Sequence, residues 1–258
     1  MPIKERKVKI LLLLFLIKDT SFDFLQFSTQ LLHMFDLTLN QKTKGTLSAM
    51  LKEGFVEKNE EGYRLTEKGF YELCLSFPYF RFIRDDWDGV WRIISYEIPE
   101  SKRHLRDRLR REMKGWGLGP WHRSFWLTAH PVIPALRDLV YGREEEQYIQ
   151  SFESTHMFGD VELLVEKVWN KIALEKQYKE LFKSWHNTLS KNVSKEEKFQ
   201  EVLLEYIKHL KDDPGLPINL VGSQWIGREA FDIYKEMRGI LLSPVSDSIS
   251  TPENYENS

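Results

Sequence analysis

The sequence lacks the features on which two large classes of protein depend. Cys74 is the single cysteine among 258 residues, so neither an intrachain disulfide nor a cysteine zinc site can form, which favours a cytoplasmic protein. One apolar run, residues 10–17, is far shorter than the roughly 20 residues that span a bilayer, and no small-residue cleavage site follows it. We therefore expect no membrane association, and a buried first helix over residues 3–18.

Catalytic signatures are missing as well. The sequence contains no G-x-S-x-G elbow, no phosphate-binding loop and no G-x-G-x-x-G motif, and its 7 histidines show no zinc-protease spacing. The net charge is only −2, so any nucleic-acid binding must come from local patches rather than from bulk positive charge. We therefore expect that the protein is not an enzyme and that it binds neither a cofactor nor a metal ion.

The most informative stretch that the chain does contain is residues 39–69. Leu47, Met50 and Leu51 fall on one side of a helix, and polar, partly basic side chains fall on the other. Gly54 ends this helix, and two short strands then flank a turn that closes with glycine. A helix with one buried and one polar stripe, backed by a hairpin, predicts a winged helix, whose polar stripe lies in the major groove of DNA.

The residues predicted to contact DNA are the polar ones on the outward stripe and on the returning strand. Glutamine can pair with adenine, and lysine with guanine or phosphate. A solvated helix face would have the same composition, so the hairpin that follows is what favours DNA binding. The predicted contacts are Gln41, Lys42, Thr43, Lys44, Ser48, Lys52, Tyr63 and Arg64.

Two further parts follow a connector helix. Residues 85–158 alternate strand and helix patterns in the order β-α-β-β-α-β, which is that of a ferredoxin-like sandwich. Residues 159–242 carry broad apolar helical faces, and residues 243–258 are predicted to be a disordered tail. The predicted fold class is α+β, with a winged helix-turn-helix and connector in residues 1–84 and a helical C-terminal domain.

The apolar spacing also predicts the limits of individual helices. In the winged helix, residues 22–36 should form the second helix, since Phe24, Leu25 and Phe27 precede further apolar residues. In the C-terminal part, Asp160 is a suitable N-cap for one long helix that continues to Trp185.

A basic helix in the central part is a second possible site. Residues 102–114 hold seven lysines and arginines, which Asp107 and Glu112 offset only in part. One interpretation is a solvated face with ion pairs between successive turns, and the other is a surface for nucleic acid or for an anionic effector. The candidates for effector binding are Arg103, Arg106 and Arg110.

An enzymatic alternative rests on Glu97, which follows the first strand of the predicted sandwich. A carboxylate there could serve a metal-dependent nuclease, but such a site normally needs several acidic ligands. The sequence indicates no clear partner, although Glu97 of a second copy could supply one. A surface or hydrogen-bonded glutamate is the simpler interpretation.

Together these segments resemble the PaaX family of transcriptional regulators, named for a repressor of phenylacetic-acid degradation. The resemblance lies in residues 43–56 and 63–69, in residues 87–110, and in the motifs at residues 213–217 and 225–227. It implies a cytoplasmic, dimeric, DNA-binding regulator that acts as a repressor and responds to a small effector, in the founding case an aryl-CoA. It also implies a central domain similar to the small ferredoxin-like nuclease of CRISPR adaptation.

The chain departs from this family pattern in the winged helix. The recognition helix of the family usually carries arginine where Lys44 and Ala49 stand here, and the wing here is acidic, with Glu57, Glu60 and Glu61. These differences imply weaker, more salt-sensitive DNA binding or a changed operator. Neither nuclease activity nor the identity of the effector is carried over.

Overall fold

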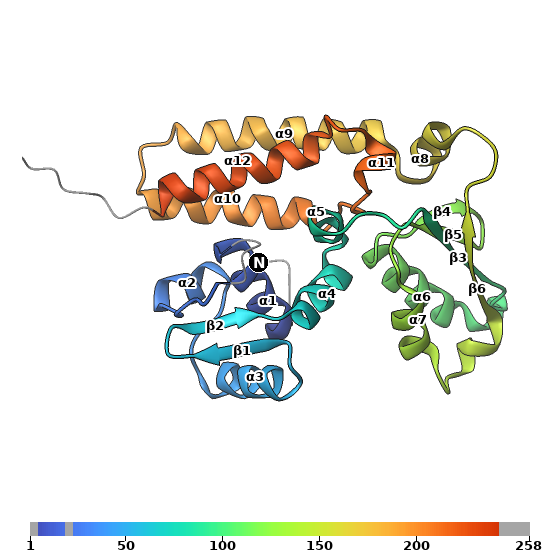
Figure 1. Ribbon diagram of the computed structural model, residues 1–258, viewed down its shortest axis with the longest axis horizontal. Helices are drawn as coiled ribbons and strands as arrows, with labels where there is room; N and C mark the ends of the chain where they lie inside the picture. The colour runs from blue at the N-terminus through green and yellow to red at the C-terminus, as the bar shows by residue number, and fades with distance from the viewer. Residues whose placement is uncertain (1–4, 19–22, 243–258) are drawn as a thin grey trace, which may run out of the picture.

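The computed structural model describes residues 5–18 and 23–242, whose elements form three neighbouring groups (Figure 1). Helices and strands are mixed, which confirms the α+β class. The predicted tail, residues 243–258, lies outside the described residues. The N-terminal group consists of α1 (Arg6–Lys18), α2 (Thr29–Met34), α3 (Gln41–Lys52), β1 (Val56–Asn59), β2 (Gly62–Leu65) and α4 (Glu67–Ser76).

Local sequence explains why α3 and the hairpin form where they do. The side chain of Asn40 caps α3 by accepting a hydrogen bond from the backbone N–H of Thr43 at 3.0 Å. After α3, Gly54 adopts a φ of +74°, a conformation that glycine takes with little strain. Strands β1 and β2 then pair antiparallel from Val56 opposite Leu65 to Asn59 opposite Gly62. The helix and hairpin predicted over residues 39–69 are therefore present.

The predicted helix over residues 22–36 is wrong in its first half. Helix α2 begins only at Thr29, while residue 22 lies outside the described part of the chain. Leu25 instead pairs with Tyr63 of β2 through two backbone hydrogen bonds of 2.8 and 3.0 Å, and the Phe27 ring stacks on that of Tyr63 at 5.0 Å. Apolar spacing alone does not separate the two conformations, and the partner strand selects the extended one.

The central group is a four-stranded antiparallel sheet covered by helices on one face. The strand order is β4-β5-β3-β6, and α6 and α7 share a core with the sheet that includes Ile94, Leu109 and Leu136. This is the arrangement of a ferredoxin-like sandwich. Its elements are β3 (Val90–Tyr96), η3 (Glu100–Lys102), α6 (Arg103–Gly115), β4 (Gly119–His122), β5 (Phe125–Thr128), α7 (Ile133–Val140), η4 (Glu144–Tyr148) and β6 (Ile149–Thr155).

The C-terminal group is helical, and it corrects the second predicted helix limit. Asn170 adopts a φ of +53° and divides the helix expected from Asp160 to Trp185 into two. Asparagine tolerates this conformation, and its side chain caps the second helix by accepting from the N–H of Ala173 at 3.1 Å. The helices are α8 (Val161–Trp169), α9 (Lys171–Leu189), α10 (Lys195–Leu210), α11 (Ile218–Val221) and α12 (Ile226–Leu241).

Helix α1 is buried and joins two of the groups. Residues 8–16 are all buried, so α1 has no solvated face along this stretch. The Phe15 ring lies 4.5 Å from that of Phe80 in the connector and 6.3 Å from that of Phe231 in α12. Arg238 of α12 donates a hydrogen bond of 2.9 Å to the carbonyl oxygen of Leu16. Among the described residues, no helix combines the length and apolar character needed to cross a membrane.

A short connector leads from α4 to the central sheet. It consists of η2 (Pro78–Phe80) and α5 (Arg81–Arg84). In Figure 1 it lies between the C-terminal helices and the sheet, at the centre of the molecule.

Candidate functional site

Helix α3 separates its residues into a buried and an exposed side. Leu47 and Met50 are 3% and 1% exposed and pack into the core of the N-terminal group. The opposite side carries amide, hydroxyl and ammonium groups that can reach a ligand without rearrangement of the helix. The exposed members of the predicted set on this helix are Gln41, Lys42, Lys44, Ser48 and Lys52.

An open groove lies between α3 and the hairpin. Its volume is about 550 Å³, with Lys44 and Ser48 on the helix side and Lys58 and Tyr63 on the hairpin side. Phe27 forms part of its floor and stacks on Tyr63. A groove with polar rims and an aromatic floor can receive the sugar-phosphate edge of a duplex while α3 lies in the major groove.

Two residues of the predicted set lie away from the groove. Thr43 is 1% exposed and lies in the core beneath α3, because its N-terminal position falls on the same side as Leu47. Arg64 donates two hydrogen bonds, of 2.8 and 2.9 Å, to one carboxylate oxygen of Glu57 and lies over the Phe24 ring. Arg64 follows Tyr63 in β2, so its side chain points to the opposite face of the hairpin and does not line the groove.

Lys58 is a groove residue that the sequence analysis missed. It is paired across the hairpin with Tyr63, so both side chains lie on the same face, and its Nζ is 5.4 Å from the centre of the Tyr63 ring. The signal was present in the sequence, since strand alternation places Lys58 opposite Tyr63 once the turn is assigned.

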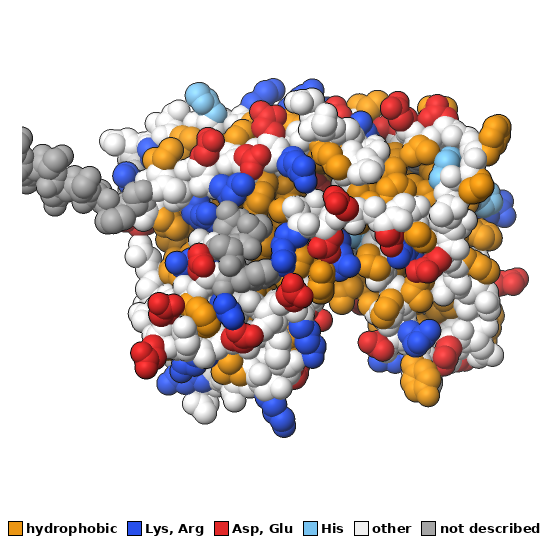
Figure 2. Space-filling model, viewed as in Figure 1, with side chains coloured by type: hydrophobic (Ala, Val, Ile, Leu, Met, Phe, Trp, Pro, Cys, Tyr) orange, Lys and Arg blue, Asp and Glu red, His pale blue; other side chains and the backbone are white. Residues whose placement is uncertain are grey.

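The surface charge around the groove is mixed. Figure 2 shows basic and acidic side chains intermingled over the lower-left lobe, where Figure 1 places α3, β1 and β2. Glu57 forms an ion pair with Arg64, whereas Glu60 and Glu61 at the hairpin turn are exposed. Positive charge on this surface therefore comes from a few lysines on and beside α3.

The basic helix α6 is in large part paired, but only one of its ion pairs joins successive turns of the helix as the first interpretation expected. Four of its basic residues, or of the turn before it, form ion pairs: Lys102 with Glu144, Arg103 with Asp107, Arg106 with Glu100 and Arg108 with Glu145. The three effector candidates do not come together. Arg106 and Arg110 line a common pocket, whereas the Arg103 side chain is 70% exposed and lies outside that pocket.

The nuclease alternative gains no ligand set from the structure. Glu97 is exposed just beyond the end of β3. Within residues 5–18 and 23–242, no group of three or more His, Cys, Asp or Glu side chains is arranged to hold a metal ion.

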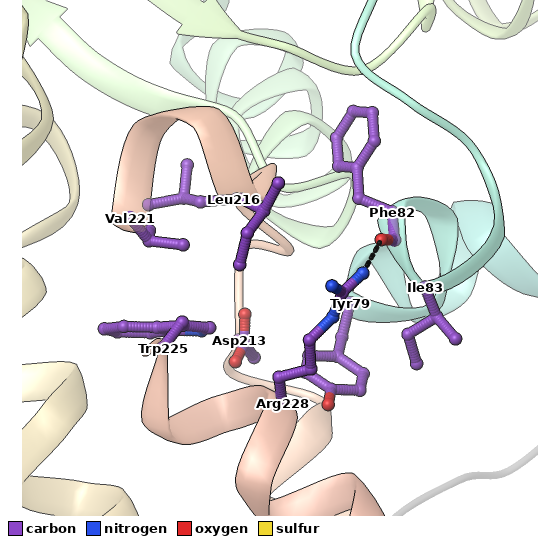
Figure 3. Close-up of a pocket in the computed structure, with 9 residues that line it drawn as sticks. Tyr79, Phe82, Ile83, Asp213, Leu216, Val221, Trp225 and Arg228 are labelled. Atoms are coloured by element: carbon purple, nitrogen blue, oxygen red, sulfur yellow. Dashed lines mark hydrogen bonds between the residues drawn. The ribbon is translucent and has the colours of Figure 1, made fainter. Parts of the chain in front are cut away.

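The connector, the central group and the C-terminal group meet at the segment between α10 and α11. Figure 3 shows Asp213 and Leu216 of this segment facing Tyr79 and Phe82 of the connector, beside a cavity of about 30 Å³. The Tyr79 hydroxyl donates a hydrogen bond of 2.6 Å to the carbonyl oxygen of Gly227 in α12. This segment carries the motif at residues 213–217, and the structure buries most of it.

Hydrogen bonds fix this junction from both sides. The hydroxyl of Tyr178 in α9 donates to the Asp213 carboxylate, which also accepts from the backbone N–H of Gly215 at 2.7 Å. His130, which follows β5, donates from Nε2 to the carbonyl oxygen of Pro214 at 2.8 Å. Burial raises the pKa of Asp213 to about 6 and lowers the pKa of His130 to about 4.

The buried His130 predicts a loss of stability in acid. Its pKa is lowered in the fold from about 6.5, so it contributes stability above pH 6.5 that is lost as the pH falls through about 4. This contribution has an upper limit of about 3.5 kcal/mol, since one pKa unit corresponds to roughly 1.4 kcal/mol. We expect His130→Gln to unfold at a lower temperature at pH 7.5 but to lose less of that temperature between pH 6.5 and 4. Thermal melts over this range measure both, and equal pH dependence of the two proteins would contradict the assignment.

Comparisons with known proteins agree with this architecture. A family model described as the PaaX protein central Cas2-like domain matches residues 84–165, and one described as the PaaX-like protein C-terminal domain matches residues 169–249. Among solved structures, the chain is similar to the uncharacterized protein Rv0674 from Mycobacterium tuberculosis, with 16% identity and a TM-score of 0.51 over 90% of this chain and 93% of that chain. At this identity the likeness concerns the fold alone. No curated protein matches the chain.

Proposed function

We propose, because the chain belongs to the PaaX family, that it binds duplex DNA and regulates transcription. In this proposal residues 1–84 form the DNA-reading domain, residues 85–158 the ferredoxin-like domain and residues 159–242 the helical C-terminal domain. The observation that carries the proposal is the exposed polar side of α3, which stands beside a groove closed by Lys58 and Tyr63. This is where a winged helix places its recognition helix against a major groove.

The mode of regulation follows the family resemblance. We propose a repressor that works as a homodimer on two half-sites, and a small effector, such as an acyl-CoA, that releases it from DNA. Two copies bound to successive half-sites contact a longer DNA sequence than one copy can. The longer site supplies sequence specificity that a few lysines alone do not provide.

The α3 residues can be tested individually by mobility shift on the DNA upstream of the protein's own gene. We expect Lys44→Ala to weaken binding by about tenfold and to reduce the slope of affinity against salt by about one, because one lysine contact to DNA is lost. Gln41→Ala should instead relax the sequence preference, because an amide reads base edges. Lys58→Ala should resemble Lys44→Ala.

Lys179→Ala provides the matched control. Lys179 is exposed on α9, far along the chain from the groove. Its replacement by alanine removes the same positive charge as Lys44→Ala. Equal losses for Lys44→Ala and Lys179→Ala would show that only overall charge matters. Absence of any sequence preference at every salt concentration would contradict the proposed function.

A further inference from the structure

Three arginines from two elements converge beyond the end of β3. Arg106 and Arg110 come from successive turns of α6, and Arg123 comes from the turn between β4 and β5. They line an open pocket of about 510 Å³ together with Tyr96, Glu97, Ile98 and Ser124. Guanidinium groups repel one another, so their convergence around an open space calls for an explanation.

Two of these arginines are held in position and retain donors. Arg106 is oriented by Glu100, to which its two terminal nitrogens donate at 2.7 and 3.4 Å, and each of these nitrogens carries a second N–H group. Arg110 is exposed, and its guanidinium lies 5.8 Å from the centre of the Trp126 ring. Arginine held in this way loses little conformational freedom when it binds an anion.

The third arginine occupies a backbone position that favours glycine. Arg123 has a φ of +29° in a two-residue turn, where residues with a side chain are strained. In the part of the chain that the structure describes, Arg123 forms no ion pair or hydrogen bond that would explain its presence there. Strain of this kind concentrates at sites where the side chain has a function.

We propose that this pocket binds the phosphate group of a small organic ligand. The planar guanidinium fork matches two phosphate oxygens, and Tyr96 and Ile98 provide an apolar contact for the rest of the ligand. Glu97 on the rim and Asp107 on the exposed side of α6 would repel a continuous phosphate backbone, which favours a small ligand over a nucleic acid. The inference rests on the proposed function only in that the ligand would be the effector.

The test measures binding of inorganic pyrophosphate directly, without DNA. Isothermal titration of the full-length protein at constant ionic strength should show saturable binding that is about tenfold or more weaker in Arg110→Ala and Arg123→Gly. Glu97→Gln should bind more tightly, since it removes the opposing charge. Arg137→Ala is the matched control, because Arg137 is exposed on α7 and does not line the pocket; its affinity should be unchanged.

Arg123→Gly also separates a binding role from a structural one. Because glycine relieves the strained turn, this variant should melt at an equal or higher temperature, by up to about 4 °C, while binding pyrophosphate less well. Coenzyme A and dephospho-coenzyme A, titrated in parallel, report whether a larger phosphate ester uses the same arginines.

Three results would overturn the inference. The first is that the protein shows no saturable binding of pyrophosphate. The second is that Arg137→Ala weakens this binding as much as the pocket variants do. The third is that the pocket variants lose affinity for a DNA duplex but not for pyrophosphate. The pyrophosphate titrations contain no DNA. They therefore test this pocket even if the proposed DNA binding proves wrong.

Discussion

Replacing Gly215 by alanine is expected to lower the melting temperature by about 10 °C. Gly215 has a φ of +65°, and a Cβ added there would lie 2.3 to 2.5 Å from the backbone of Pro78 and Tyr79. Backbone atoms cannot move aside as a flexible side chain can, so the connector and the segment after α10 would have to separate. Backbone strain and overpacking together cost about 3 kcal/mol or more, and for a chain of this size each kcal/mol corresponds to roughly 2–4 °C.

Gly142→Ala is the control for this substitution. Gly142 has nearly the same backbone conformation, with a φ of +67°, but a Cβ there would meet no atom within 4 Å. It should therefore show the strain alone, about 1 kcal/mol, and a loss of about 3 °C. Differential scanning calorimetry of the two variants separates conformation from close approach. Equal losses would mean that contact between the connector and Gly215 contributes nothing to stability.

Replacing Asp213 by alanine is the second large expected effect, a loss of about 2–4 kcal/mol. The substitution leaves the buried hydroxyl of Tyr178 and the N–H of Gly215 without their acceptor. Each unsatisfied buried donor costs about 1–3 kcal/mol, and removal of a buried carboxylate offsets part of that cost. Urea unfolding monitored by tryptophan fluorescence gives the difference in unfolding free energy.

Asp213→Asn retains an acceptor oxygen and should stay within about 1 kcal/mol of the wild type at neutral pH. It should also change the response to acid. Because burial raises the pKa of Asp213 to about 6, this group contributes stability below pH 4 that is lost as the pH rises through 6. That contribution opposes the one from His130. We therefore expect Asp213→Asn to lose stability more steeply on acidification than the wild type, and a shallower loss would contradict the pKa direction.

The sequence predicted those features that depend on local spacing. The stripe of Leu47 and Met50 identified α3, and the glycines around the hairpin identified its limits. The alternation of strands and helices after residue 85 predicted the ferredoxin-like order.

Features that depend on a partner distant in the chain were beyond local spacing. The extended conformation at Leu25 needs Tyr63, and the position of the Arg64 side chain follows from Glu57 across the hairpin. The convergence of Arg123 with the α6 arginines needed the turn geometry as well as the strand order. In each case local spacing could not identify the contacting residue, because that residue lies far away in the sequence.

The burial of α1 has a consequence for how a signal could travel through this protein. Because α1 contacts both α3 and α12, it holds the N-terminal group that carries α3 against the C-terminal helices. In the proposed dimer, a change elsewhere in the molecule would then act by moving the two N-terminal groups relative to each other. Successive half-sites are about 34 Å apart along DNA, which is one helical turn. A displacement of a few ångströms would therefore move one of the two α3 helices out of its major groove. If the protein is the proposed dimeric repressor, this attachment of α3 makes the distance between the two α3 helices the variable on which repression depends.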